Sequence, residues 1–112
     1  MTKRELNQHR TLLQRLEKNR KLLEFLEVAG LADEAAGIRD DIASLDAEVQ
    51  RSAAAVTAWV DTVEDLPTRM IFRLRFLWDL EWKTVAALIG GGNTKASVEK
   101  RVARYLEAHH DE

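Results

Sequence analysis

The C-terminal segment gathers the side chains best suited to holding a nucleic acid. Arg and Lys donate hydrogen bonds to guanine edges and phosphate oxygens, and Asn, Ser and Thr bond to base edges and phosphates. The candidates are Asn93, Thr94, Lys95, Ser97, Lys100, Arg101 and Arg104. Their types and close spacing predict contact with DNA.

Two short amphipathic segments, at residues 82–89 and 94–109, are separated by the glycine turn Gly90-Gly91-Gly92-Asn93. This pattern predicts a helix-turn-helix, in which the second helix enters the major groove of duplex DNA. Lys83 and Thr84, at the start of the first helix, are further DNA-binding candidates. Gly91 and Gly92 carry no side chain, so we expect their backbone amides to approach a phosphate closely.

The apolar residues of the last segment share one helical face: Val98, Val102, Tyr105 and Leu106. The outward face then presents Ala96, Lys100 and Arg104. In a standard helix-turn-helix spacing the buried position would fall at Ala96. Val98 is the better anchor here, so the glycine turn is longer than usual.

Two long helices precede these elements. The first is expected from Lys3 to Val28, with Gly30 as its stop, and the second begins near Asp33. A near-heptad pattern on the second, with one polar interruption at Ser52, predicts an antiparallel, coiled-coil-like hairpin. Its seam, closed within the chain or against a second copy, comprises Leu13, Leu16, Leu23, Ile38, Ile42, Leu45, Val49, Val56 and Trp59.

Leu66-Pro67 marks the boundary between this hairpin and a third helix over residues 67–78. We expect Met70, Ile71, Leu74 and either Leu77 or Trp78 to point inward, and Trp78 and Trp82 to cap the core. Arg69 and Arg73 could contact phosphates or pair with the acidic second helix. The predicted fold is all-α: a hairpin over residues 1–64, for oligomerisation or partner binding, and a three-helix DNA-binding module over residues 65–112.

The net charge of −2 conceals a strong segregation along the chain. Residues 1–29 carry seven bases and four acids, residues 30–66 carry two bases and nine acids, and residues 67–106 carry eight bases and three acids. The +5 balance of this last stretch favours a nucleic-acid partner, because exposed charges act only over about 8 Å at physiological salt.

The stretch from Leu66 to Leu106 resembles the fourth region of bacterial sigma factors. It has a Leu66-Pro67 opening, the arginine-phenylalanine pair Arg75-Phe76, an acidic turn at Asp79-Leu80-Glu81, and then Val85-Ala86 and Leu88-Ile89-Gly90. It is similar above all to small sigma-like proteins of prophages, which join such a module to an N-terminal helical segment. The resemblance implies a phage transcriptional regulator and RNA polymerase as a possible partner.

The sequence lacks the motifs that are typical of several other classes of function. No nucleophile elbow, phosphate-binding loop or zinc-protease motif is present, so we expect no enzyme and no cofactor. His109 and His110 beside Asp111 and Glu112 are interpreted as a frayed tail rather than a metal site. The chain has no cysteine, no apolar leader segment and no run long enough to span a bilayer, which predicts a cytoplasmic protein with no membrane partner.

The function expected from the sequence is therefore sequence-specific binding of double-stranded DNA by a phage-type transcriptional regulator. Self-association through the hairpin would supply two half-sites. Two alternatives remain at this stage. One is a DNA-packaging protein like a small terminase subunit, and the other is a helical adaptor that binds proteins and no DNA.

Overall fold

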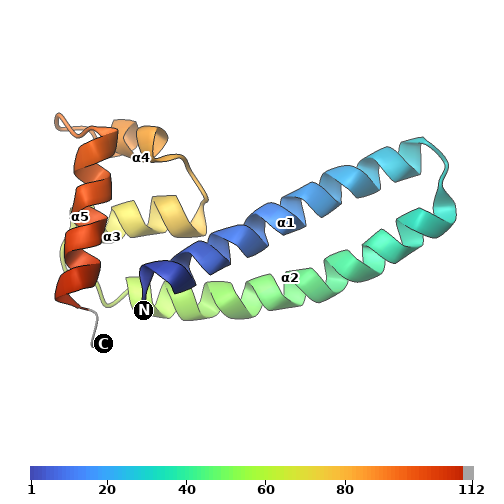
Figure 1. The fold of residues 1–112 in the computed structure, drawn as a ribbon, viewed down its shortest axis with the longest axis horizontal. Coiled ribbons are helices and arrows are strands. Elements are labelled where there is room, and N and C mark those ends of the chain that lie inside the picture. The colour runs from blue at the N-terminus through green and yellow to red at the C-terminus, as the bar shows by residue number, and fades with distance from the viewer. Residues whose placement is uncertain (110–112) are drawn as a thin grey trace.

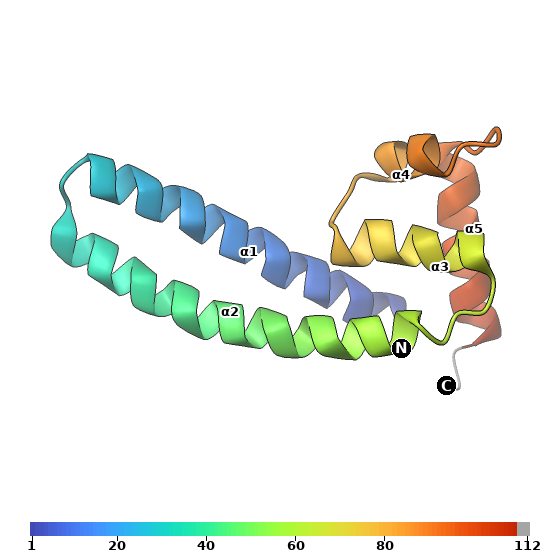
Figure 2. The same ribbon diagram turned by 180° about the vertical axis from the view of Figure 1, so that it is seen from behind.

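The computed structural model describes residues 1–109, and all the regular structure in that range is helical (Figure 1). The elements are α1 (Lys3–Val28), α2 (Ala32–Val60), α3 (Leu66–Phe72), the π-helical turn η1 (Arg73–Leu77), α4 (Trp82–Ile89) and α5 (Lys95–Ala108). The two long helices extend away from a compact group formed by the other elements (Figures 1 and 2). No helix in the described range combines the length and apolar character needed to cross a membrane.

The helices α1 and α2 run side by side in opposite directions (Figures 1 and 2). Thr2 caps α1 by accepting a 3.1 Å hydrogen bond from the Glu5 amide. Gly30, with φ of 74°, follows the helix end and turns the chain back, as predicted. The predicted limits of α1 are confirmed, and α2 begins one residue before Asp33.

Most of the predicted seam residues pack between α1 and α2 or in the main core. Leu16, Leu45 and Val49 are buried together, and Leu12, Leu13 and Ile42 pack around them. Leu23 and Ile38, nearer the tip, are half-buried. Val56 and Trp59 join the main core at the other end. The seam is therefore closed within one chain.

Asp65 caps the N-terminus of α3. The Asp65 carboxylate accepts a 3.1 Å hydrogen bond from the Thr68 amide, and Pro67 occupies the first turn, where no amide donor is needed. The single helix predicted over residues 67–78 is divided in the structure, because the last turn widens into η1. The Trp78 amide donates to the Arg73 carbonyl, five residues back, at 3.1 Å.

The main core joins the base of the hairpin to the module. Phe72 and Phe76 are fully buried at its centre, where Leu6 from α1 and Val60 from α2 meet Val98 and Val102 from α5. Trp59 packs edge-on against Phe72, with ring centroids 4.9 Å apart. The chain thus changes direction near residue 64, but residues from both sides of this boundary pack in the same hydrophobic core.

Two predicted core positions were wrong. Met70, expected to point inward, is 42% exposed, and Trp78, expected to cap the core, is 70% exposed. Of the alternatives Leu77 and Trp78 for the last inward position, Leu77 packs against the core. Met70 lies on the outer side of α3, whose inner side carries the buried Ile71 and Phe72. Trp78 follows η1, where the wider turn changes the helical phase on which the prediction relied. Trp82 does pack against the core, edge-on to Phe76 at 6.1 Å.

Candidate nucleic-acid interface

The helix α5 carries apolar side chains on one side and basic side chains on the opposite side. Val98, Val102 and Leu106 are buried against the main core, where Val85 and Ala86 of α4 also lie. Val98, rather than Ala96, is the buried anchor, as the sequence predicted. The phase of the helix then leaves Lys100 and Arg104 exposed on the opposite side.

Three predicted DNA-binding side chains form the cap of α5. The Ser97 amide donates to Thr94 Oγ1 at 3.2 Å, and the Thr94 amide donates to Ser97 Oγ at 2.8 Å. Asn93 Oδ1 lies 3.1 Å from Ser97 Oγ, and Asn93 Nδ2 donates to the Gly90 carbonyl at 2.8 Å. This reciprocal cap holds the turn against the first turn of α5, and it occupies the side-chain oxygens expected to face DNA.

The glycine turn has a backbone that few other residues adopt. Gly91 and Gly92 have φ values of 62° and 80°, and no atom lies within 4 Å of the Cβ that either could carry. Both are exposed. The turn therefore presents bare backbone to solvent immediately before the N-terminus of α5, where the helix dipole favours anions.

Three bases share one surface of α5. Lys100, Arg101 and Arg104 line an open hollow of about 320 Å³ together with Asn93 and Ser97. All three bases are exposed. Five of the predicted DNA-binding residues thus meet at one place, and we call this surface the α5 basic face.

The other predicted bases lie around this face. Lys95 is exposed and forms an open ion pair with Glu99 at 3.8 Å, which an anion can compete with. Lys83 and Thr84 are exposed on the first turn of α4. Arg101 also acts on Asp65, whose pKa is lowered first by hydrogen bonds from Thr68 and then by the charge of Arg101.

The arginines of α3 and η1 have partners within the chain. Arg73 Nη2 lies 2.7 Å from Asp61 Oδ1 at the end of α2, and Arg69 Nη1 donates to the Val63 carbonyl at 3.2 Å. Arg75 donates to the Leu80 carbonyl at 2.9 Å and stacks over Trp82, 4.5 Å from the ring centroid. Burial lowers the pKa of Arg75. The ion pair of Arg73 with Asp61 fits the second of the two roles considered, pairing with the acidic second helix, whereas Arg69 bonds a backbone carbonyl in the loop that follows α2.

Asp79, which the sequence reasoning placed only in a turn, ties the module to α1. Its Oδ1 accepts hydrogen bonds from Arg10 Nε at 2.7 Å and from Gln14 Nε2 at 3.3 Å. It holds a positive φ of 55°, which Asp tolerates better than most residues. The acidic turn was visible in the sequence, but its partners lie more than sixty positions upstream.

The described residues contain no group of three or more potential metal-ligating side chains. The His109 ring stacks on Tyr105, with centroids 3.9 Å apart, and its Nδ1 lies 2.8 Å from the Tyr105 carbonyl. His110, Asp111 and Glu112, the rest of the tail considered above, lie outside the described residues.

Comparison of the chain with models of protein families, with curated proteins and with solved structures found no match.

Proposed function

We propose that this protein binds duplex DNA through α4, the glycine turn and α5, acting as a helix-turn-helix. The observation that carries the proposal is the α5 basic face. Lys100, Arg101 and Arg104 are exposed around one hollow, while the opposite side of the same helix is buried in the core. A helix with this division can enter a major groove without exposing its apolar side.

The contacts follow from the position of each group. Lys100 and Arg104 lie where a helix in the groove meets base edges, and Arg101 and Lys95 flank them towards the phosphates. The Gly91 and Gly92 amides and the N-terminus of α5 meet a phosphate from the other side. Lys83 and Thr84, at the start of α4, contact the adjoining backbone. Arg69 and Arg73 position α3.

The cellular role that we propose is transcriptional regulation in a phage or prophage. It rests on the resemblance of residues 66–106 to the fourth region of sigma factors. RNA polymerase is the protein partner that this resemblance suggests. The DNA contact stands on the α5 basic face alone and does not depend on this role.

A salt series tests the DNA contact. Five exposed bases, Lys83, Lys95, Lys100, Arg101 and Arg104, are available on α4 and α5. If about four of them neutralise phosphates, log K should fall with log salt at a slope of about −4, as measured by fluorescence anisotropy of a labelled duplex. No binding at low salt, or binding independent of salt, would disprove the proposal.

A further inference from the structure

One side of the hairpin is turned away from the module. Arg10 and Gln14 bond to Asp79 from the side of α1 that faces η1. Because successive helical residues are rotated by about 100°, Gln8 and Leu12, each two positions before one of these residues, lie roughly 160° around α1 from them. The side of the hairpin that carries Gln8 and Leu12 therefore faces away from η1.

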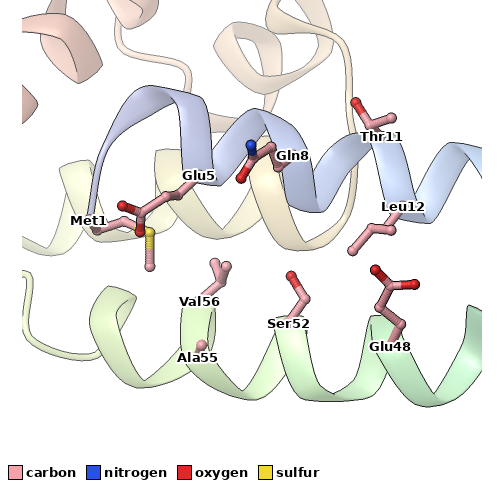
Figure 3. Close-up of a pocket in the computed structure, with 9 residues that line it drawn as sticks. All are labelled: Met1, Glu5, Gln8, Thr11, Leu12, Glu48, Ser52, Ala55 and Val56. Carbon is pink, nitrogen blue, oxygen red and sulfur yellow. The ribbon is translucent and has the colours of Figure 1, made fainter.

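This side contains a groove of about 460 Å³ between α1 and α2, over the half of the hairpin nearer the module. Figure 3 shows Gln8 and Leu12 of α1 across the groove from Ser52 and Val56 of α2. Its apolar lining comes from Met1, Leu12, Ala55 and Val56. A groove of this volume has room for several apolar side chains of a bound partner.

A small residue keeps the groove open on the α2 side. Ala55 lines the groove and is exposed, although its neighbour Val56 is only 3% exposed and belongs to the main core. A longer side chain at position 55 would project into the groove. The apolar floor is therefore accessible from solvent.

Both ends of the groove are acidic. Glu5 lies at the end near Met1 and Glu48 at the end near Leu12, and none of the lining side chains in the described part of the chain is basic (Figure 3). His9 bonds to Ser52, so Glu48, four residues from Ser52, lies level with position 13 of α1. This level is eight residues, or about 12 Å, from Glu5.

The acidic character continues from the groove towards the tip of the hairpin. Asp41 and Glu34 precede Glu48 by seven and fourteen residues. A seven-residue step changes the direction of a side chain by only about 20°, so all three acids lie on the groove side of α2, and we call them the acidic edge. All three are exposed, and within residues 1–109 none of them forms an ion pair.

The bases of α2 leave this edge with a net negative charge. The helix carries six acids and two bases. One base, Arg39, is paired with Glu27 at 3.0 Å, and the other, Arg51, lies one turn from Glu48. A single base beside three acids does not neutralise them, so the edge attracts a partner of positive charge.

We propose that the groove and the acidic edge bind an amphipathic helix of a partner protein, which carries an apolar stripe and a row of lysines or arginines beside it. The apolar side chains enter the groove over Ala55, and the bases lie along Glu34, Asp41 and Glu48. The bound helix completes a three-helix coiled coil with α1 and α2.

The spacing of the acids fits a helical partner. Acids seven residues apart on α2 are about 10.5 Å apart, and bases seven residues apart on a helix lying alongside repeat at the same interval. From Ala55 to Glu34 the face is about 32 Å long, which a helix of about 21 residues covers. An acidic helix would meet the acidic edge with like charge, which disfavours it as a partner.

Fluorescence anisotropy of a labelled synthetic peptide, measured with the full chain, tests the proposal. The probe is a helix of three heptads with leucines at the a and d positions, lysines at e and glutamines at g, and the matched peptide has glutamates in place of the lysines. The lysine peptide should bind with an affinity that falls as salt rises, and the glutamate peptide should bind at least about tenfold more weakly. No binding of the lysine peptide, or equal binding of the two peptides, would overturn the proposal.

Two neighbouring alanines provide matched variants for the groove. Ala55 lines it, whereas Ala54 is also exposed on α2 but points in a direction about 100° away. Ala55→Arg fills the groove and repels the lysines, so it should weaken binding of the lysine peptide at least about tenfold. Ala54→Arg makes the same change of charge and should alter the affinity less than about twofold. Equal affinities of two folded variants, with helicity checked by circular dichroism, would show that the peptide does not enter the groove.

A pair of charge reversals tests the acidic edge. Asp41→Lys with Glu48→Lys should lower the affinity for the lysine peptide at least about tenfold. Glu24→Lys with Asp40→Lys changes the net charge equally at two exposed acids outside the edge and should change the affinity less than about threefold. An equal loss in both would mean that net charge alone attracts the peptide.

Sedimentation velocity without peptide separates this partner from a second copy of the chain. The wild type should sediment independently of Ala55→Arg. A wild-type dimer that Ala55→Arg disperses and Ala54→Arg does not would assign the groove to a second copy and contradict the proposal. None of these measurements contains DNA, so they are independent of the proposed function.

Discussion

His9 on α1 and Ser52 on α2 form a 2.7 Å hydrogen bond inside the seam of the hairpin. Ser52 is the one polar interruption of the heptad pattern, and His9 is only 1% exposed. The imidazole Nε2 is buried and has no hydrogen-bond partner among residues 1–109. Ser52 therefore supplies a hydrogen-bond partner for a buried histidine, whose second ring nitrogen lies unsatisfied close to the main core.

The hydrogen bond predicts strong coupling between the two residues. Ser52→Ala should lower the free energy of unfolding by about 1 kcal/mol, because it leaves a second imidazole nitrogen unpaired. Ser52→Ala combined with His9→Leu should recover most of that loss, because no unpaired polar atom then remains. Urea unfolding of the wild type, both single variants and the double variant measures the coupling. Additive effects would show that the hydrogen bond contributes nothing.

The stability of the fold should decrease in mild acid because of His9. Burial lowers its pKa, and the negative charge of Asp79 opposes this only in part. The unfolded chain takes up a proton near pH 6.5 while the folded chain still holds a neutral ring. Stability is thus fully present above pH 6.5 and is lost as the pH falls from there through the folded pKa. Urea midpoints at pH 7.5, 6 and 5 should decline for the wild type and stay closer to level for His9→Gln.

Helical periodicity predicted the positions of the helices well, but it predicted the side-chain contacts between distant residues poorly. The limits of α1 and α4 and the buried anchor Val98 followed from local spacing and capping. The π-helical turn η1 did not follow from local spacing, and it is followed by the exposed Trp78, which had been expected to cap the core. The His9–Ser52 and Arg10–Asp79 contacts join residues 43 and 69 positions apart, which no local pattern specifies.

The stability of the fold should depend on both the charge and the backbone conformation of Asp79. Asp79→Ala removes the acceptor for Arg10 and Gln14 and places a Cβ residue without a local hydrogen bond at φ of 55°. It should cost about 2 kcal/mol for the lost contacts and about 1 kcal/mol more for the backbone. Asp79→Gly should avoid the second loss, and Asp79→Asn should fall between Gly and the wild type. Equal unfolding midpoints for the Ala and Gly variants would contradict the backbone argument.

The glycine turn should contribute to DNA affinity. Ala at both Gly91 and Gly92 strains a backbone held at positive φ and moves the amides from the position proposed for a phosphate. DNA affinity should fall in this double variant. Gly37→Ala, inside α2 where Ala favours the helix, is the control and should be stabilised by up to about 1 kcal/mol with DNA affinity unchanged. Unchanged DNA affinity of the Gly91, Gly92 variant would show that the turn does not contact DNA.

The most direct test of the account compares two charge reversals of equal size by fluorescence anisotropy with one labelled duplex. Lys100→Glu with Arg104→Glu reverses the α5 basic face, and Lys3→Glu with Arg51→Glu reverses two exposed bases on the hairpin. Each pair takes the net charge from −2 to −6. The first pair should abolish measurable binding, lowering affinity by at least about 100-fold, while the second pair should change it less than about threefold. An equal loss in both pairs would mean that net charge alone attracts DNA and that α5 is not the binding helix.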